Sequence, residues 1–463
     1  MQRRTVSPGR GRSTQNSIVT RTGLSRPSNV VRELHKNDGT NPRSVRGRQI
    51  ATAMEDLMDE VYGGGVTQPP PPAPTQQRLS QQQQRGNNSL SLSGGGGVYA
   101  RFRTSFNASA VPRSWRSGPV DTAGRSFNAS DRNLLCMDVH TQNNLCVVGS
   151  ADHGLKVFDI TTVREKRNLY TKNYGHTEWV TCCKFFQSSG HVISGGMDSK
   201  LCLWSATGPV RCSDLLGHTG SISQVEVNES NQLVMSSSYD RTLRLWDCSG
   251  GVSGRCVATF AGHKAPVMMF SWCGGQVLSG DRQGTTKVWD VETGECLSTM
   301  ATKRGQIGSL WHLLSSSVGL LSAIGDQGGV LTVLDYPRTG SKPIYQDVLH
   351  PGGVVSAIRS VDETPYLITA GADKVILTLD PRAGFAPLHR FTDHRDFIYS
   401  LETFGPLILS GGGNGWLLVH DTMTGNCCYG LGANTAAVRE IAATPTHLVA
   451  AGDDGNAMVY DYM

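Results

Sequence analysis

The sequence has no uninterrupted apolar run of about 18 residues, the length that crosses a bilayer as a helix, so it predicts no transmembrane span. Its beginning, MQRRTVSPGRGRSTQ, has no apolar core, and this argues against a secretory signal. No acidic residue precedes Glu33, a feature shared with mitochondrial presequences, so that alternative stays open. We expect a cytoplasmic protein, with a cytoskeletal or nuclear location within the same expectation.

No CxxC pair occurs among the 12 cysteines, and most of them lie inside apolar, strand-like runs such as WVTCCKF. This placement is typical of reduced, buried thiols that serve as small hydrophobic side chains. The glycine runs also lack the Lys-Ser/Thr or the helix that a phosphate-binding loop requires. The sequence therefore predicts no disulfide framework, no metal and no cofactor.

The first part of the chain is poor in lysine and in aromatic residues. Residues 1–130 contain 18 Lys and Arg, of which one is lysine, against 7 Asp and Glu, a net charge of +11. Residues 131–463 contain 25 against 31, a net charge of −6. Residues 1–95 include TQPPPPAPTQQ and QQQQ and have little to bury, so we expect a disordered basic arm.

One segment of this arm has the spacing of a helix. Apolar residues in RQIATAMEDLMDEVYG recur every three to four positions, with acidic residues between them, which predicts a short helix over residues 48–62. Such a short helix is marginal alone. It either docks on a partner or forms only transiently, and the sequence does not choose between the two.

From residue 131 the sequence becomes periodic. An apolar run closed by Asp, or once by Ser, recurs eight times, as KVFD, CLWS, RLWD, KVWD, TVLD, LTLD, LVHD and MVYD. The last residues of these runs are 46, 42, 43, 45, 45, 41 and 40 positions apart. Each unit contains short strands joined by tight turns, which predicts a small antiparallel sheet per repeat.

The unit SSSYDRTLRLWD, with GHTGSIS before it and AGHKAPV after it, resembles the WD-repeat family. The resemblance covers about residues 131–463, is close in units 2 to 4, and implies an all-β fold, a β-propeller of four-stranded antiparallel blades. We expect eight blades, with seven blades and an irregular unit as the alternative. The last unit ends at its third strand, so residues 96–130 are expected to be partly ordered and to supply the ring-closing strand, from 98–109 or from 124–130.

Residues of a nucleophilic triad, namely His218, Ser236 and Asp240, occur in the third unit. The same types recur in the unit before it, whereas an enzyme needs one activated nucleophile. The family resemblance implies instead a buried hydrogen-bond chain from indole to hydroxyl to imidazole to carboxylate in each blade. We therefore predict a structural network and no enzymatic activity. The residues expected in it are His176, Ser194, Asp198, Trp204, His218, Ser236, Asp240, Trp246, His263, Ser279 and Trp289.

The network weakens around the ring. The fourth unit has Gln283 at the Asp position, and the sixth has Leu379 at the Trp position. The seventh has His394 and Ser410 with His420 where Trp is expected, and units 1, 5 and 8 lack most members. We expect the first half of the ring to be the more rigid.

Propellers of this family bind partners mainly on the face with the turns between second and third strands and the loops entering the first strands. Aromatic and arginine side chains dominate interfaces, and on that face the resemblance places Trp179, Met197, Tyr239, Arg282 and Phe397. We expect a scaffold or adaptor that binds proteins, with the arm holding it to an acidic surface such as microtubules or RNA. The propeller is expected to be monomeric, alone or within a larger complex.

A second hypothesis is a substrate receptor of a cullin-type ubiquitin ligase. Residues 45–62 are too short for an F-box, and Leu379-Asp380-Pro381-Arg382 only approximates the Trp-Asp-x-Arg motif of such receptors. RNA binding through the arm is a third hypothesis; arginines bind phosphate, but the few aromatics there argue against reading bases.

Overall fold

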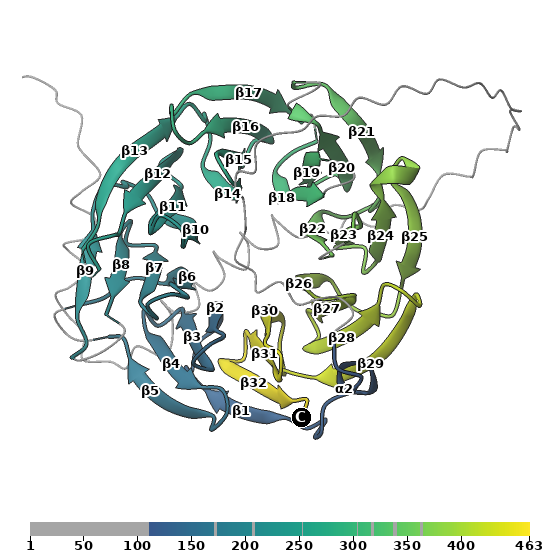
Figure 1. Cartoon of the computed structure of the whole chain (residues 1–463), viewed down its shortest axis with the longest axis horizontal. Helices are drawn as coiled ribbons and strands as arrows, with labels where there is room; N and C mark the ends of the chain where they lie inside the picture. Colours follow the sequence, from purple (N-terminus) through teal and green to yellow (C-terminus); the bar gives the residue numbers. More distant parts are fainter. Residues whose placement is uncertain are drawn as a thin grey trace, which may run out of the picture. The chain divides into compact units, whose positions relative to one another are not determined.

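The computed structural model describes residues 111–170, 174–205, 209–251, 253–302, 304–315, 319–336, 340–361 and 364–463. The expected disordered arm and its helix over 48–62 lie outside the described residues. The described strands form eight four-stranded antiparallel sheets placed around a ring (Figure 1). The predicted all-β propeller is confirmed, with eight blades rather than seven. No helix among the described residues is long and apolar enough to cross a membrane.

Two strands of each blade lie near the axis of the ring. The innermost strands are β2 Leu134–His140, β6 Val180–Phe185, β10 Ile222–Asn228, β14 Val267–Cys273, β18 Ile307–Ser315, β22 Val355–Ser360, β26 Ile398–Phe404 and β30 Val438–Ala443. The second strands are β3 Leu145–Ser150, β7 Val192–Gly196, β11 Leu233–Ser238, β15 Gln276–Asp281, β19 Gly319–Asp326, β23 Leu367–Gly371, β27 Leu407–Gly412 and β31 His447–Gly452.

The other two strands lie toward the rim. The third strands are β4 Leu155–Asp159, β8 Leu201–Trp204, β12 Thr242–Asp247, β16 Thr285–Asp290, β20 Val330–Leu334, β24 Ile376–Asp380, β28 Trp416–Asp421 and β32 Asn456–Asp461. The outer strands are β5 Arg164–Asn168, β9 Cys212–Leu215, β13 Arg255–Ala261, β17 Cys296–Ala301, β21 Pro343–Val348, β25 Ala386–Phe391, β29 Asn426–Gly432 and β1 Arg125–Asn128. Blades 1 to 8 are numbered from the innermost strands β2, β6 and so on to β30.

Burial follows the position of the strand in the blade. The second strands β7, β23, β27 and β31 are buried at every residue, because neighbouring blades cover both of their faces. Apart from His447 at the start of β31, their residues are apolar or small, as expected for strands covered on both sides. The outer strand β13 is mostly exposed, with Phe260 its one buried residue. The core is thus divided into layers between blades.

Glycines in the second strands allow adjacent blades to approach closely. A Cβ atom on Gly195 of β7 would lie 2.6 Å from Cγ2 of Ile222 in the next blade. At Gly280 of β15 it would lie 2.9 Å from Cγ2 of Ile307. These glycines are present because any side chain would separate the blades.

The ring closes through β1. This strand pairs antiparallel with β32, with Arg125 opposite Val459 and Asn128 opposite Asn456 (Figure 1). It comes from the second of the two segments expected to supply the closing strand, and the other, 98–109, lies outside the described residues. Closure pairs the edge of β32, which would otherwise be open to a second chain.

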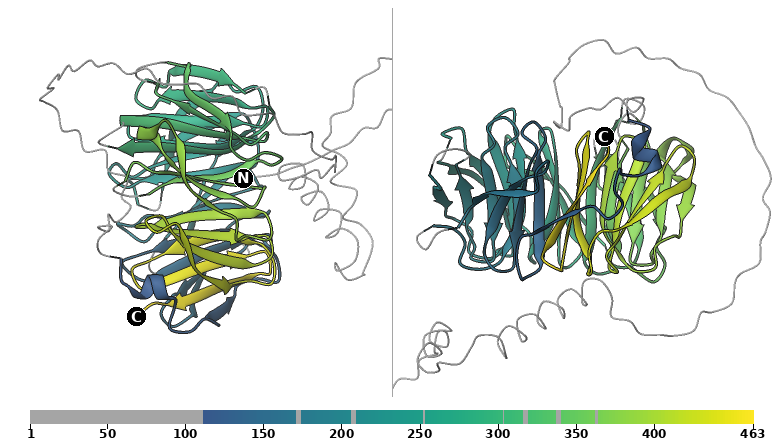
Figure 2. Two further views of the ribbon diagram at one scale, coloured as in Figure 1. Left: turned by 90° about the vertical axis from the view of Figure 1, so that its right-hand side faces the viewer. Right: turned by 90° about the horizontal axis from the view of Figure 1, so that it is seen from below.

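A short helix before β1 also closes the ring. In helix α2, Ser114–Ser117, Trp115 is fully buried and its indole Nε1 donates to the Pro445 carbonyl at 3.2 Å. Its ring stacks on Tyr462, with centroids 4.0 Å apart. The helix lies beside β29 at the junction of blades 7 and 8 (Figures 1 and 2). Residues 111–130 thus belong structurally to the propeller.

Candidate functional site: blade networks and a protein-binding face

The second blade contains a complete hydrogen-bond chain. Indole Nε1 of Trp204 donates to Oγ of Ser194 at 2.9 Å, and this hydroxyl lies 2.9 Å from Nε2 of His176. On the other side of the imidazole, Nδ1 lies 3.0 Å from Oδ1 of Asp198. The chain links the third strand, the second strand and the loop before the first strand, so it ties one blade together.

The third blade repeats this geometry. Trp246 Nε1 donates to Ser236 Oγ at 2.8 Å, Ser236 Oγ lies 2.8 Å from His218 Nε2, and His218 Nδ1 lies 2.7 Å from Asp240. Burial alone would raise the pKa of Asp240, but hydrogen bonds from Thr242 and His218 bring it below its usual value. Ser236 is fully buried beneath the indole, so its hydroxyl has no access to a substrate.

The fourth blade corrects the sequence alignment. His263 Nδ1 lies 2.9 Å from Asp281, and Gln283 does not take the carboxylate's place. Asp281 is fully buried at the end of β15 and also accepts from the backbone N–H groups of Gln283 and Thr285. With Ser279 and Trp289, at 2.7 and 2.8 Å, the fourth network is complete. The prediction that Gln283 replaces the acid was wrong because the acid stands two residues earlier.

The weaker units keep part of the network. In blade 6, His350 lies 2.9 Å from the Thr369 hydroxyl and 2.8 Å from Asp373, as the sequence order suggests. Blade 1 has Ser130 in the position of the histidine, with its hydroxyl 2.6 Å from Asp152.

Blade 8 has Asn434 in the histidine position, where its amide donates to Asp454 at 2.8 Å. In every blade an acidic or amide residue in the turn between the second and third strands therefore accepts a backbone N–H, even where the imidazole is lost. In blade 2 this N–H belongs to Thr177 before the first strand, and in the other blades it belongs to the turn or the start of the third strand. The acidic and amide residues are Asp152, Asp198, Asp240, Asp281, Asp326, Asp373, Asn414 and Asp454.

Four of the five residues expected to contact partners lie on consecutive blades. The backbone N–H of Met197 donates to the Trp179 carbonyl at 2.9 Å within blade 2. Ser221, which enters blade 3, donates its hydroxyl to the Met197 carbonyl at 3.3 Å. Tyr239 and Arg282 occupy the matching turns of blades 3 and 4. We call Trp179, Met197, Tyr239 and Arg282 the contact arc.

The side chains of the contact arc differ in exposure. Met197 is exposed at 40%, whereas Trp179, Tyr239 and Arg282 are half-buried. Burial raises the pKa of the Tyr239 phenol, and the Arg282 charge opposes that shift, so these neighbours interact across blades. Phe397 is half-buried in the loop before β26 of blade 7 and is therefore separated from the arc by other blades.

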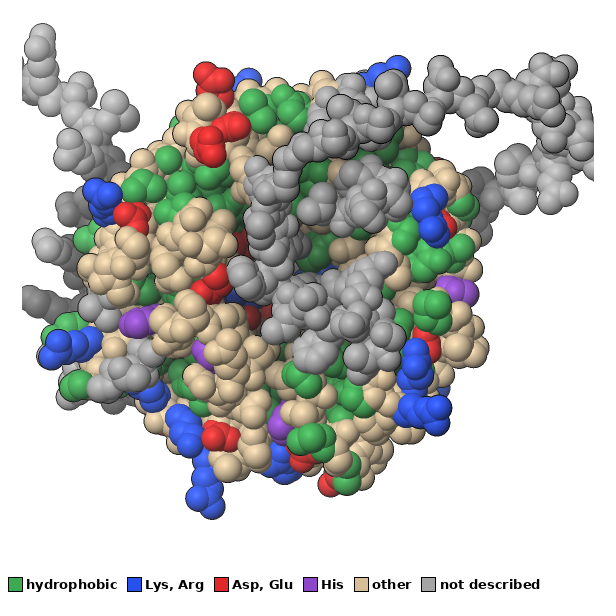
Figure 3. Space-filling view, viewed as in Figure 1, with side chains coloured by type: hydrophobic (Ala, Val, Ile, Leu, Met, Phe, Trp, Pro, Cys, Tyr) green, Lys and Arg blue, Asp and Glu red, His purple; other side chains and the backbone are tan. Residues whose placement is uncertain are grey.

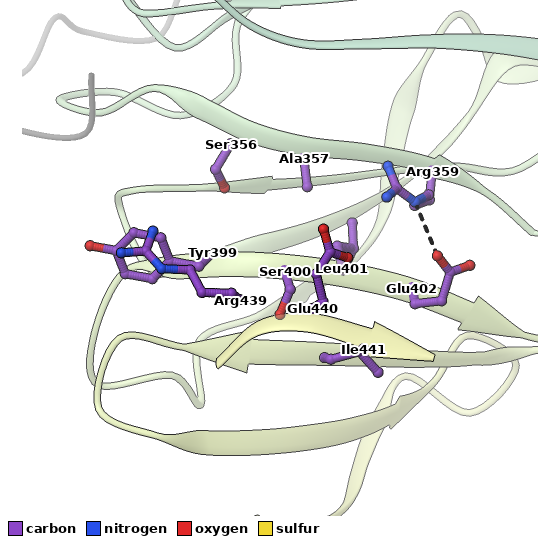
Figure 4. Close-up of a pocket in the computed structure, with 10 residues that line it drawn as sticks. All are labelled: Ser356, Ala357, Arg359, Tyr399, Ser400, Leu401, Glu402, Arg439, Glu440 and Ile441. Atoms are coloured by element: carbon purple, nitrogen blue, oxygen red, sulfur yellow. Dashed lines mark hydrogen bonds and ion pairs between the residues drawn. The ribbon is translucent and has the colours of Figure 1, made fainter. Parts of the chain in front are cut away.

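A small polar cavity lies between blades 6, 7 and 8. Its volume is about 100 Å³, and Arg359, Tyr399, Glu402, Arg439 and Glu440 are among its lining residues (Figure 4). Arg439 is held by Asp453 at 2.7 to 2.9 Å and lies over the Tyr399 ring at 4.5 Å. Drug-sized ligands need about 300 Å³ or more. This cavity therefore suits water or a single side chain.

The sequence analysis did not identify a set of charged residues on the innermost strands. The fifth residue is charged in β2, β6, β10, β22 and β26, as Asp138, Lys184, Glu226, Arg359 and Glu402. The Lys184 ammonium lies 3.2 Å from Asp138, and Arg359 Nε lies 3.5 Å from Glu402. Their equal position in successive repeats was a usable signal.

One carboxyl group near these charges has an unusual pKa. Burial raises the pKa of Glu440 to about 7, although the charges of Lys184 and Arg359 oppose the shift. Glu440 lies on β30, between the innermost strands β2 and β26, and the two cations stand one blade further on either side, on β6 and β22. The carboxyl therefore titrates near neutral pH.

The two signs of charge are interspersed on the face shown in Figure 3. Lys and Arg side chains stand mainly at the rim, with acidic side chains among them. A nucleic-acid interface is expected to have a continuous basic stripe. The visible part of this face has no such stripe.

The comparison with family models agrees with the three complete networks. The model for "WD domain, G-beta repeat" matches residues 167–205, 210–247 and 254–290. These ranges contain the first three strands of blades 2, 3 and 4, preceded by the end of β5 in the first range and by the whole of β9 and β13 in the other two.

Relatives and solved structures resemble the same region. "Mitochondrial division protein 1" of Saccharomyces cerevisiae is 26% identical over 183 residues, 39% of this chain and 21% of that protein. "Guanine nucleotide-binding protein subunit beta" of Solanum tuberosum is 28% identical over 202 residues, 40% of this chain and 53% of that one. The chain thus spans between a fifth and about half of these relatives' length.

Among solved structures, Sqt1 of Chaetomium thermophilum bound to the N-terminus of the ribosomal protein L10 is similar. It has a TM-score of 0.65 at 17% identity, over 74% of this chain and 100% of that one. This likeness concerns the fold. The repeat matches and the eight sheets together show that the chain contains WD repeats, at residues 167–205, 210–247 and 254–290, within a β-propeller fold.

Proposed function

We propose that the protein is a non-catalytic scaffold whose propeller binds other proteins through the contact arc. The observation that carries this proposal is the alignment of Met197, Tyr239 and Arg282 on three consecutive blades, at the same turn of each. An exposed thioether, a half-buried phenol and a guanidinium offer the apolar area and the directed charge that interface hot spots use.

The repeated Ser, His and Asp residues support a non-catalytic role. Ser194, Ser236 and Ser279 are all fully buried and already accept an indole N–H each. A nucleophile needs an open approach to the reacting carbonyl. Three copies of the same buried hydrogen-bond network are better explained by a role in stabilising the fold than by catalysis.

The basic arm is proposed as a tether to an acidic surface, such as microtubules or a ribonucleoprotein, in the cytoplasm. Its support is the net charge of +11 over residues 1–130, set against −6 over the rest. Electrostatic attraction of this kind weakens as salt is added. Binding through the arm should therefore be salt-sensitive, and binding through the arc much less so.

The experiment compares partner capture by the tagged full chain and by variants of matched exposure. Met197→Asp with Arg282→Glu should lose the proteins that the wild-type chain retains at raised salt. Leu388→Asp is the control, because Leu388 lies on the outer strand β25 and is exposed at 42%, close to the 40% of Met197. Equal capture by the arc variant and the wild type would contradict the proposal.

A truncated chain distinguishes binding through the basic arm from binding through the propeller. A chain without residues 1–110 should keep the arc-dependent proteins and lose the salt-sensitive ones. The truncation must retain residues 111–130, because α2 and β1 complete blades 7 and 8. Loss of every partner with the arm would contradict binding through the propeller.

The ligase-receptor alternative rests on Arg382. Its guanidinium binds Asp380 at 2.9 and 3.0 Å, yet its side chain is 51% exposed, so it is presented at the surface from the short 3-10 helix Pro381–Ala383. Capture of a cullin adaptor that is lost in Arg382→Ala, but kept in the arc variant, would favour this alternative over the scaffold.

A further inference from the structure

Blade 7 differs from blades 2, 3 and 4 at two positions that touch each other in space. In the three complete blades, glycine precedes the network histidine, and tryptophan stands at or one residue before the end of the third strand. In blade 7 these positions hold Asp393 and His420. Both replacements introduce a side chain that can ligate a metal.

The two replacements compensate each other in volume. A Cβ atom on Gly175 would lie 3.0 Å from Cη2 of Trp204, and one on Gly217 would lie 3.2 Å from Cη2 of Trp246. A side chain before the histidine therefore conflicts with the indole. The smaller imidazole of His420 leaves space that Asp393 occupies, with Nε2 and Oδ2 3.2 Å apart.

A cysteine completes the cluster. The residue opposite the tryptophan on the outer strand is cysteine in blades 2, 3 and 4, and blade 7 keeps it, with Cys427 opposite His420. Ligand atoms of Asp393, His420 and Cys427 all lie within 4.8 Å of one another. Only in blade 7, among these four blades, does that cysteine face an imidazole instead of an indole.

From this arrangement we propose that Asp393, His420 and Cys427 bind one zinc ion. Zinc takes carboxylate, imidazole and thiolate ligands at about 2.0 to 2.3 Å in a tetrahedron, which places two ligand atoms about 3.3 Å apart. The 3.2 Å between Asp393 and His420 already has this value. The Cys427 sulfur lies within 4.8 Å of both, and its side chain is exposed.

The cluster combines one buried imidazole with two ligands at the surface. His420 is fully buried against Phe391, at 4.6 Å between ring centroids, and its Nδ1 has no hydrogen-bond partner within the described part of the chain. Asp393 is 48% exposed and Cys427 is exposed, which gives the ion a path from solvent.

Binding changes one protonation state and no oxidation state. The Cys427 thiol gives its proton to the solvent as its sulfur bonds the ion, and a water fills the fourth position. The ion would join the loop before β26 to β28 and β29. In blade 7 it would thus replace the link that tryptophan makes elsewhere. The sequence predicted no metal because these ligands are 27 and 7 residues apart, with no CxxC spacing.

A second thiol cluster does not have the same need for a cation. Cys202, Cys212 and Asp214 also lie within 4.8 Å of one another. There the ammonium of Lys200 already lies 2.7 Å from the Asp214 carboxylate. Because Lys200 already supplies a positive charge there, we do not propose a second zinc site at this cluster.

Cobalt(II) is the probe for this site, because thiolate-bound cobalt has a near-ultraviolet charge-transfer band. The full chain, stripped with a chelator, should bind one equivalent of cobalt with this band, and zinc should displace it. Cys427→Ser should abolish the band, and Asp393→Asn should weaken zinc binding more than about a hundredfold, since loss of even outer-shell partners costs 10–100-fold. Both residues are at the surface, so the variants should fold.

The matched control is Cys256→Ser, which removes the exposed cysteine opposite Trp246 and should leave the band unchanged. A double variant, Asp393→Gly with His420→Trp, restores the pattern of blades 2 to 4 and should remain folded without binding cobalt. No thiolate band in the wild type, or a band that persists in Cys427→Ser, would overturn the proposal.

Discussion

Blades 3 and 7 have different side chains at the same position of the third strand, Trp246 in blade 3 and His420 in blade 7. In blade 3 an indole reaches across the sheet to Ser236 and closes a chain that ends at Asp240. In blade 7 His394 still lies 2.7 Å from Ser410, but the imidazole that replaces the indole turns to Asp393. The polar chain is thereby divided into two shorter pairs.

This difference shows that the repeat conserves a linkage between strands rather than a fixed set of residues. A buried polar group is stable only when its partners are present. Blade 1 meets this condition with Ser130, and blade 8 meets it for the amide nitrogen of Asn434, whose Oδ1 has no partner within the described residues. Partial networks of this kind should still hold their turns, though they join fewer strands.

The largest expected effect comes from removing an indole. Trp246→Ala should lower the free energy of unfolding by about 3–5 kcal/mol, because it deletes a fully buried side chain and leaves Ser236 without its donor. His420→Ala should cost less, since the imidazole is smaller. Urea unfolding measures the free energy of unfolding of the two variants. An equal decrease in both would contradict the difference proposed between blades 3 and 7.

The exchange of volume between Asp393 and His420 makes the next largest prediction. His420→Trp alone should destabilise the fold by about 1–3 kcal/mol, because the indole overpacks against Asp393. Adding Asp393→Gly should recover most of that loss, giving a coupling energy of about 1 kcal/mol or more. Additive effects on the free energy of unfolding in this double-mutant cycle would mean that residues 393 and 420 do not interact.

Blade 4 gives a sharper test of the network itself. Asp281→Ala should cost about 1–3 kcal/mol, because the His263 imidazole and two backbone N–H groups lose their acceptor. Gln283→Ala, at the exposed position where the alignment placed the acid, should change stability by no more than about 0.5 kcal/mol. Thermal unfolding of both variants decides which residue completes the chain.

Blade 4 also shows what the sequence alone could predict. The regular spacing of the terminal Asp residues was enough to predict eight blades, because each repeat must bury its faces against its neighbours. The register within a turn was not predictable. Asp281 follows Ser279 by two residues, whereas Asp240 follows Ser236 by four, and the imidazole reaches either position.

Contacts between distant segments were beyond the sequence argument for a different reason. Nothing local to Trp115 indicates that its ring stacks on Tyr462, 347 positions away. The cluster of Asp393, His420 and Cys427 likewise forms only when three segments of one blade meet. Such placements depend on the completed ring rather than on any single motif.

A further prediction concerns the pH dependence of stability. The Glu440 pKa is raised from 4.5 to about 7, so the folded state holds its proton more tightly than the unfolded state. The stability from this proton is complete below pH 4.5 and is lost as pH rises through about 7. Glu440→Gln should flatten the fall in stability over that window.

The Asp240 carboxyl should behave in the opposite way and provides the comparison for Glu440. Its pKa is lowered, so its contribution is present above its ordinary pKa of 3.8 and is lost as pH falls below that value. Chemical unfolding of wild type and Glu440→Gln from pH 4 to 8 tests the assignment. Identical slopes in the two proteins would contradict it.

Native-state hydrogen exchange of the full chain, with metal removed by a chelator, tests the central claim most directly. The claim is that complete networks make blades 2 to 4 the most resistant to local opening. Amides of β11 and β15 should then exchange more slowly than those of β27, although all three strands are similarly buried. Equal exchange in the three strands, or slower exchange in β27, would contradict the account.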